Sequence, residues 1–266
     1  NALENIITGN SGNNTLDGGL GNDALLGGDG DDSLIGGSGN NVFYGGDAFT
    51  DTGIDTVDYS GAGTAITVDL LGGTATGTGI SDLLSGIENI IGSSGNDVVF
   101  ADGNANIIDG QGVGDSDTVN YQFSTGGVAI TINGVVAGTG GYAQGDVLSN
   151  IENVTGSIFD DQITADAGIN TIDGSFGNDT VSYANSTAGV TLTLNGASNS
   201  AAGVGGDAAG DILVNVENLI GSNDPALSDF LTGDAQVNVL EGLAGSDTLD
   251  GGTGADTLIG GAGNDT

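Results

Sequence analysis

The chain has 266 residues, 36 acidic side chains and no Lys, Arg, His or Cys, which gives a formal charge of −36 at pH 7. This composition argues against nucleic acid and anionic membrane partners, and against disulfides, zinc and haem. No apolar run is long enough to insert into a membrane, and self-repulsion opposes folding unless the chain takes up cations from solution.

The opening stretch repeats every nine residues. Glycine pairs recur at Gly18-Gly19, Gly27-Gly28, Gly36-Gly37 and Gly45-Gly46. They follow a frame Gly-Gly-x-Gly-x-Asp-x-U-x, in which U is apolar and whose positions we number one to nine. Glycine tolerates the positive φ of a tight turn, so positions one to six predict a turn. Positions seven to nine predict a short strand with position eight inside.

A longer repeat of about 65 residues lies over the short one. A Glu-Asn element recurs, as does an Asp-Thr-Val-x-Tyr element that contains Tyr59, Tyr121 and Tyr183. Strands with alternating apolar and polar residues follow these tyrosines at 65–70, 128–133 and 190–195. The sequence shows no helix signal. We therefore predict an all-β solenoid of stacked nonapeptide coils, interrupted by short alternating strands.

The chain is expected to form one continuous array and to be a fragment of a longer protein. The expected blocks are about 1–86, 87–150, 151–215 and 216–266.

Position six carries the predicted metal ligands. Stacked strands lie about 4.8 Å apart, so the carboxylates of neighbouring turns would repel one another unless a cation lay between them. Calcium accepts six to eight oxygen ligands in flexible geometry, including backbone carbonyls, whereas magnesium requires a stricter octahedron. We therefore predict multiple calcium ions. The Asp residues that fit the frame best are Asp23, Asp32, Asp97, Asp161, Asp179, Asp247, Asp256 and Asp265.

Further candidate ligands depart from the frame. Insertions precede Asp55, Asp117 and Asp229. Position six is an amide at Asn14, Asn41, Asn106, Asn170 and Asn238. Degenerate coils contain Asp82, Asp146 and Asp211. The alternative role for these residues is structural, because Asp and Asn also stabilise turns through their own backbone and stacked Asn forms amide ladders.

The segments "GGDGDDSLI" (27–35) and "GGTGADTLI" (251–259) match the frame at every defined position. They resemble the repeats-in-toxin (RTX) family. The resemblance implies a right-handed parallel β-roll with calcium between turns, held by the position-six Asp and by turn carbonyls. The longer block resembles those of large secreted bacterial RTX proteins and adhesins.

Two functions remain open at this stage. The first is a structural or adhesive array that leaves the bacterium by type I secretion, folds on calcium outside the cell and self-associates into a surface layer, fibre or adhesin. The alternative is a calcium-dependent secretion and folding module of a secreted enzyme or toxin. Catalysis by this segment is not expected, since it has no His, Cys or Lys to act as base or nucleophile.

Overall fold

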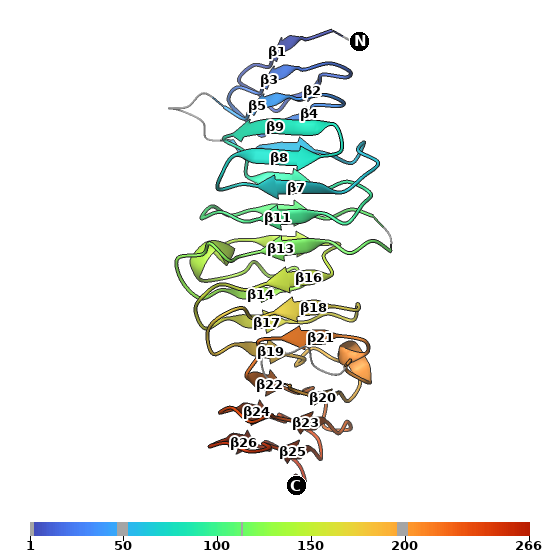
Figure 1. Cartoon of the computed structure of the whole chain (residues 1–266), viewed down its shortest axis with the longest axis vertical. Helices are drawn as coiled ribbons and strands as arrows, with labels where there is room; N and C mark the ends of the chain where they lie inside the picture. The colour runs from blue at the N-terminus through green and yellow to red at the C-terminus, as the bar shows by residue number, and fades with distance from the viewer. Residues whose placement is uncertain (1–2, 47–52, 113, 196–201) are drawn as a thin grey trace. The chain divides into compact units, whose positions relative to one another are not determined.

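The structure, a computed structural model, describes residues 3–46, 53–112, 114–195 and 202–266. Within those residues the regular elements are β-strands of three to six residues and two short 3₁₀ helices, η1 (Gly141–Ala143) and η2 (Gly206–Ala208). The strands are labelled in Figure 1, and the chain divides into two compact units. Unit 1 is Asn1–Val119 with Gly145–Ile151, and unit 2 is Asn120–Gln144 with Glu152–Thr266.

Unit 1 contains two series of paired strands. The first series is, in spatial order, β1 (Ile6–Thr8), β3 (Ala24–Leu26), β5 (Val42–Tyr44), β9 (Ile80–Ser85), β8 (Thr74–Gly77), β7 (Ile66–Asp69), β11 (Val98–Phe100) and the first two residues of β13 (Thr118–Asn120). The second is β2 (Thr15–Asp17), β4 (Ser33–Ile35), β6 (Thr56–Asp58), β10 (Asn89–Ile91), β12 (Ile107–Asp109) and β15 (Val147–Ser149).

Unit 2 contains three series. The longest is β14 (Ala129–Thr131), β17 (Gln162–Thr164), β19 (Thr180–Ser182), β22 (Asn218–Ile220), β24 (Val239–Glu241) and β26 (Thr257–Ile259). The second is β16 (Asn153–Thr155), β18 (Thr171–Asp173) and β21 (Ile212–Val214). The third is β20 (Thr191–Thr193), β23 (Phe230–Thr232) and β25 (Thr248–Asp250).

Each nonapeptide stacks on the second nonapeptide after it, because consecutive nonapeptides supply opposite sheets. Leu16 of β2 pairs in parallel with Leu34 of β4, while Leu25 of β3 pairs with Phe43 of β5. The predicted all-β parallel β-roll is therefore confirmed. Position eight fills its interior, where Leu25, Leu34 and Phe43 are fully buried.

The alternating strands mark where the roll departs from simple coiling. β7 falls within the predicted strand 65–70, and it pairs antiparallel with β8, which in turn pairs antiparallel with β9. Gly73 and Gly79, both with positive φ, turn the chain between these strands. In unit 2 the same reversal shortens to single antiparallel bridges, from Ala129 to Thr139 and from Thr191 to Val204.

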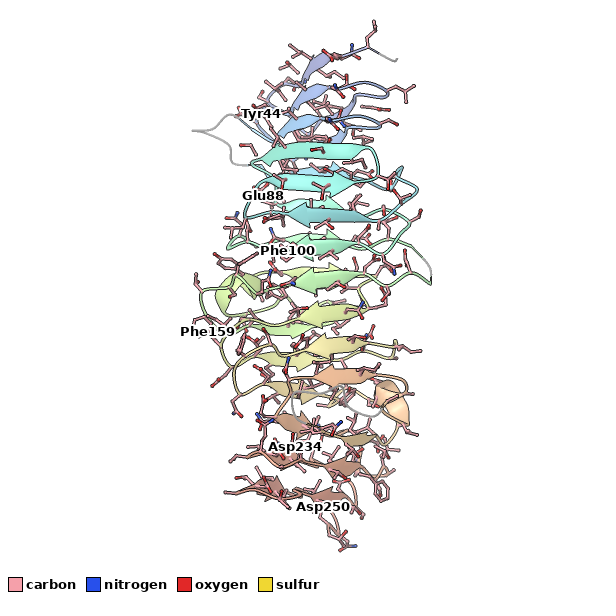
Figure 2. All side chains as sticks on the ribbon, in the orientation of Figure 1. Tyr44, Glu88, Phe100, Phe159, Asp234 and Asp250 are labelled. Carbon is pink, nitrogen blue, oxygen red and sulfur yellow. The ribbon has the colours of Figure 1, made fainter. Side chains whose placement is uncertain are left out.

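Burial decreases at the outer strands and turns. Leu258 occupies position eight, yet it is 47% exposed, because β26 is covered on one side only, by β24. Large side chains such as Tyr44 and Phe159 also reach the surface (Figure 2).

Candidate metal centres

The position-six side chains form ladders inside the roll. Asp23 Oδ1 accepts a hydrogen bond of 2.8 Å from the backbone N–H of Asn5, one turn earlier. Asn41 Oδ1 accepts the N–H of Asp23 in the same way, at 3.0 Å, and Asp82 Oδ1 accepts that of Asn41. Both Asp23 and Asn41 are buried, so these bonds satisfy backbone donors that water cannot reach.

Nine further predicted ligands occupy equivalent places. Asp32, Asp55, Asp117, Asp146, Asp179, Asp211, Asp247, Asp256 and Asp265 each accept, through Oδ1, the N–H of the position-six residue one turn earlier. Stacking thus aligns the position-six side chains in columns, as predicted. In each of these carboxylates, Oδ1 accepts a backbone hydrogen bond. The surroundings of Oδ2 therefore determine whether the carboxylate can bind a further ligand.

The first kind of turn is defined by its backbone. Its position-two residue has a left-handed backbone, with φ of +90° at Gly19, +74° at Ser175 and +67° at Leu243. The full set is Gly19, Gly28, Gly37, Gln111, Ser175, Leu243, Gly252 and Gly261. Within the described residues, Oδ2 of Asp23, Asp179 and Asp247 in such turns is buried and has no hydrogen-bond partner. A buried carboxylate oxygen without a partner is costly, so it indicates a missing ligand.

Backbone oxygens converge on the same point. A Cβ added to Gly18 would lie 2.6 Å from Asp23 Oδ2 and 2.9 Å from the carbonyl oxygen of Gly36 in the next stacked turn. At Gly242 it would likewise meet Asp247 Oδ2 and the carbonyl oxygen of Gly260, the latter at 2.8 Å. Carboxylate and carbonyl oxygens from two turns are the hard donors that calcium takes, so these turns fit calcium.

Burial disfavours the charged form of Asp179 and of Asp247 and raises their pKa values. Burial, followed by the charges of Asp161, Glu217 and Asp160, raises the pKa of Asp179 to about 7 against one backbone hydrogen bond that lowers it. Burial also raises the pKa of Asp247. A cation at these oxygens would favour the charged carboxylates and so lower both pKa values.

A family model for the RTX calcium-binding nonapeptide repeat (4 copies) matches residues 1–34, 26–48, 84–117, 155–185 and 229–266, more than half of the chain. The chain belongs to the RTX calcium-binding repeat family. RTX repeats form structural calcium-binding β-rolls and are typical of secreted proteins. No curated protein matches the chain. No helix in the described residues is long and apolar enough to span a membrane.

A second kind of turn departs from this RTX pattern. Its position two is Ser93, Ser157 or Ser222, and none of these residues is left-handed. The N–H of Ser93 donates to Asp97 Oδ2 at 2.6 Å and its hydroxyl donates to Oδ1 at 2.7 Å. Ser157 bonds Asp161, and Ser222 bonds Asp229, in the same way. Sequence reasoning missed these serine caps, although serine follows the glycine at the head of each later block.

The Asn positions have a structural reason that the sequence reading also missed. Asn106 Nδ2 donates to the carbonyl of Glu88 at 2.8 Å, and Asn238 Nδ2 donates to that of Glu217 at 2.8 Å. Asn170 makes the equivalent bond to Glu152 at 3.1 Å. Only an amide can donate here. Asn14 Oδ1 instead accepts the N–H of Asn10 within its own turn.

The Glu and the Asn of the Glu-Asn element each accept a backbone hydrogen bond from another turn. Glu88 Oε2 accepts the N–H of Asp55, and Glu217 Oε2 accepts that of Asp179, each at 2.9 Å. Asn89 Oδ1 accepts the N–H of Ile107 at 2.8 Å in the following turn. These glutamates therefore replace a position-six side chain within a column, which explains why the element recurs once in each block.

The degenerate coils pair carboxylates with the recurring tyrosines. Tyr59 donates its hydroxyl to Asp82 Oδ2 at 3.2 Å, and Tyr183 donates to Asp211 Oδ2 at 2.9 Å. Burial raises the pKa of Asp82, and it raises that of Asp211 to about 6. Calcium ligation by Asp82, Asp146 and Asp211 remains a prediction, but both oxygens of Asp82 and of Asp211 already have protein partners.

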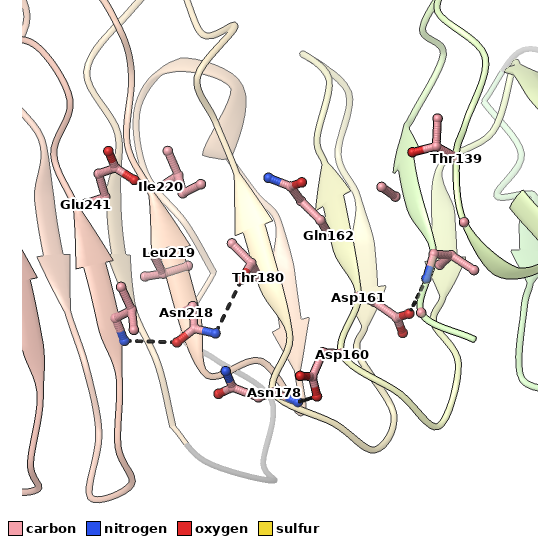
Figure 3. A pocket seen from close by; sticks show the side chains of 15 residues that line it. Thr139, Asp160, Asp161, Gln162, Asn178, Thr180, Asn218, Leu219, Ile220 and Glu241 are labelled. Atoms are coloured by element: carbon pink, nitrogen blue, oxygen red, sulfur yellow. Dashed lines mark hydrogen bonds between the residues drawn. The ribbon is translucent and has the colours of Figure 1, made fainter. Parts of the chain in front are cut away.

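Unit 2 also has an open groove of about 570 Å³ along β17, β19 and β22 (Figure 3). Its lining includes Asp161, which accepts the N–H of Val128, and Asn218, which bridges Thr180 and the N–H of Val239. These hydrogen bonds run between neighbouring coils, so the lining stabilises the stack.

The Asn bonds lead to a testable expectation. Asn238→Asp restores the RTX consensus residue, yet we expect it to lower the free energy of unfolding by about 2 kcal/mol, because a carboxylate oxygen would face the carbonyl of Glu217. Urea unfolding at fixed calcium measures this change. Asn223→Asp, on an exposed residue, adds the same charge and should change stability by less than about 0.5 kcal/mol. Equal effects of the two substitutions would contradict the assignment.

Proposed function

We propose that this chain is a structural and adhesive segment of a secreted bacterial RTX protein. It folds on calcium after export, builds a surface layer, fibre or adhesin at the cell surface, and catalyses no reaction of its own. The observation that carries the proposal is that Oδ2 of Asp23, Asp179 and Asp247 is buried without a hydrogen-bond partner, in a chain of charge −36 that has no cationic side chain.

The ligands we assign are position-six carboxylates of left-handed turns, together with turn carbonyls. In unit 1 they are Asp23, which faces the carbonyl of Gly36, and Asp32, which faces that of Gly45. In unit 2 Asp247 faces the carbonyl of Gly260. Bound calcium supplies the positive charge that lets adjacent turns approach. At ten times the dissociation constant, each site adds about 1.4 kcal/mol to the free energy of unfolding.

The structural role follows from the repetition. The same coil, Glu-Asn element and tyrosine recur through the chain, and the described groove is lined by side chains that bond neighbouring coils. Carboxylates that remain at the turn surfaces, such as Asp29 and Asp31, could share calcium with a second copy of the chain. Self-association that depends on calcium is therefore the proposed mode of assembly.

The test combines calcium binding with assembly. The purified 266-residue chain is titrated with calcium while far-UV circular dichroism and sedimentation velocity are recorded. We expect β-structure and then larger species to appear as calcium rises, and both to reverse on chelation. An unchanged spectrum in excess chelator would contradict folding on calcium. A monomer at every calcium concentration would contradict the structural array and favour the alternative, a folding module of a larger secreted protein.

A further inference from the structure

The described residues include left-handed turns, which fit calcium, and serine-capped turns, which do not. The serine-capped turns, defined by Ser93, Ser157 and Ser222, hold the position-six Asp entirely with protein donors. Asp97 Oδ1 accepts the N–H of Ile66 at 2.7 Å and the Ser93 hydroxyl, while Oδ2 accepts the Ser93 N–H. Each carboxylate oxygen of Asp97 therefore already has a short hydrogen bond.

The same arrangement occurs twice in unit 2. Asp161 accepts the N–H of Val128 at 2.8 Å together with the N–H and hydroxyl of Ser157. Asp229 accepts the N–H of Val190 at 2.7 Å together with the N–H and hydroxyl of Ser222. The same serine N–H and hydroxyl donors occur in three turns, so the serine cap is a recurring feature of the blocks.

The backbone of these turns also differs from the calcium-fitting turns. Gly19 and Gly21, at positions two and four of one fitting turn, are both left-handed. At the same positions of the capped turns, Ser93 and Gly95 are not left-handed, and neither are Ser157 and Phe159. In the capped turns the N–H of Ser93, Ser157 and Ser222 donates to Oδ2 of the position-six Asp. In the left-handed turn of Gly19, Oδ2 of Asp23 is buried and has no hydrogen-bond partner.

The coil that follows each capped turn differs from it. Its position six is Asn106, Asn170 or Asn238, and the amide Nδ2 donates to a glutamate carbonyl. Oδ1 of Asn106 and of Asn170 is buried without a hydrogen-bond partner, so these amides are only half satisfied by the protein. Only the serine-capped coil of each block is therefore complete without metal.

We infer that the serine-capped coils fold without calcium, so that calcium controls the left-handed turns. The family model includes capped turns within its matches at 84–117 and 155–185. The capped turns of this chain do not fit the ion that the family binds. Calcium then orders a structure that already contains metal-free segments in each unit. This inference rests on the calcium binding of the proposed function.

Amide hydrogen exchange read by mass spectrometry tests it on the whole chain, using acid-protease digestion since trypsin has no site. On transfer to calcium-free buffer, the N–H groups of Asn5 and Asn14, which bond Asp23 and Asp32, should exchange at least about a hundredfold faster. Those of Ile66, Val128 and Val190, which bond the capped Asp residues, should change less than about threefold. Equal loss of protection at both groups would overturn the inference. No change at any amide would instead overturn calcium-dependent folding itself.

A variant makes the test specific to the cap. Ser93→Gly restores the glycine pair, and in calcium-free buffer it should speed exchange of the Ile66 N–H at least about tenfold, with calcium restoring the protection. Equilibrium dialysis should then show additional bound calcium. Ser94→Gly is the matched control, because Ser94 is exposed and does not bond Asp97. An Ile66 exchange rate equal in Ser93→Gly and Ser94→Gly would overturn the role of the cap.

Discussion

Gly92→Ala should destabilise the protein by about 3 kcal/mol. The added Cβ would lie 2.5 Å from Asp97 Oδ2 and 2.6 Å from the carbonyl oxygen of Gly110 in the next stacked turn. The carbonyl belongs to the backbone and cannot rotate away, so two coils must separate to make room. Urea unfolding at saturating calcium, followed by circular dichroism, measures the loss.

The matched control is Gly61→Ala in the same unit. Gly61 has no atom within 4 Å of an added Cβ, and its φ is not left-handed. Its substitution should be neutral or should stabilise by a few tenths of a kcal/mol, because alanine restricts the unfolded chain. Similar losses at Gly92 and Gly61 would show that glycine at position one is not required by close stacking.

Calcium-free protein should become less stable as the pH rises from about 5 to about 8. A free Asp carboxyl has a pKa of about 3.9, whereas in the fold burial raises that of Asp179 to about 7 and that of Asp211 to about 6. Between these values the folded state binds more protons than the unfolded state, so the free energy of unfolding falls as the pH increases. Far-UV circular dichroism of metal-free protein between about pH 5 and about pH 8 measures this change as β-structure gained at the lower pH.

Calcium should change that pH dependence. Protons compete with calcium for Asp179, so the apparent calcium affinity should fall as the pH drops below about 7. Asp179→Asn should flatten the metal-free slope, whereas Asp250→Asn, which removes an exposed carboxylate, should leave it nearly unchanged. If both variants had the same slope, general charge repulsion rather than burial of Asp179 would be the cause.

The fold could be predicted because it depends on spacing. Glycine every nine residues and an apolar residue at position eight determine the coil, and the buried Leu25 and Leu34 confirm it. The alternating strand at 65–70 was also predicted, since β7 lies within it. Its antiparallel pairing with β8 was not predicted, because the same alternation suits either strand direction.

The calcium ligands were harder to predict from the sequence than the fold, because both kinds of turn carry aspartate at position six. Asp23 and Asp97 occupy the same position of the repeat, but a left-handed Gly19 precedes one and a capping Ser93 precedes the other. The reason for Asn106 depends on a carbonyl one turn away, at Glu88, so it appears only when the coils are stacked. Contacts between turns, rather than the repeat alone, determine which carboxylates remain open.

The paired tyrosines give the protein an internal optical marker. Tyr59 lies in unit 1 and Tyr183 in unit 2, and burial together with the facing carboxylate raises the pKa of both phenols far above the ordinary value. The chain has no tryptophan, so phenolate absorbance in the ultraviolet is not obscured. In alkaline solution these two rings can ionise only when their coils open. The resulting rise in phenolate absorbance would therefore report when the coils open, without any label.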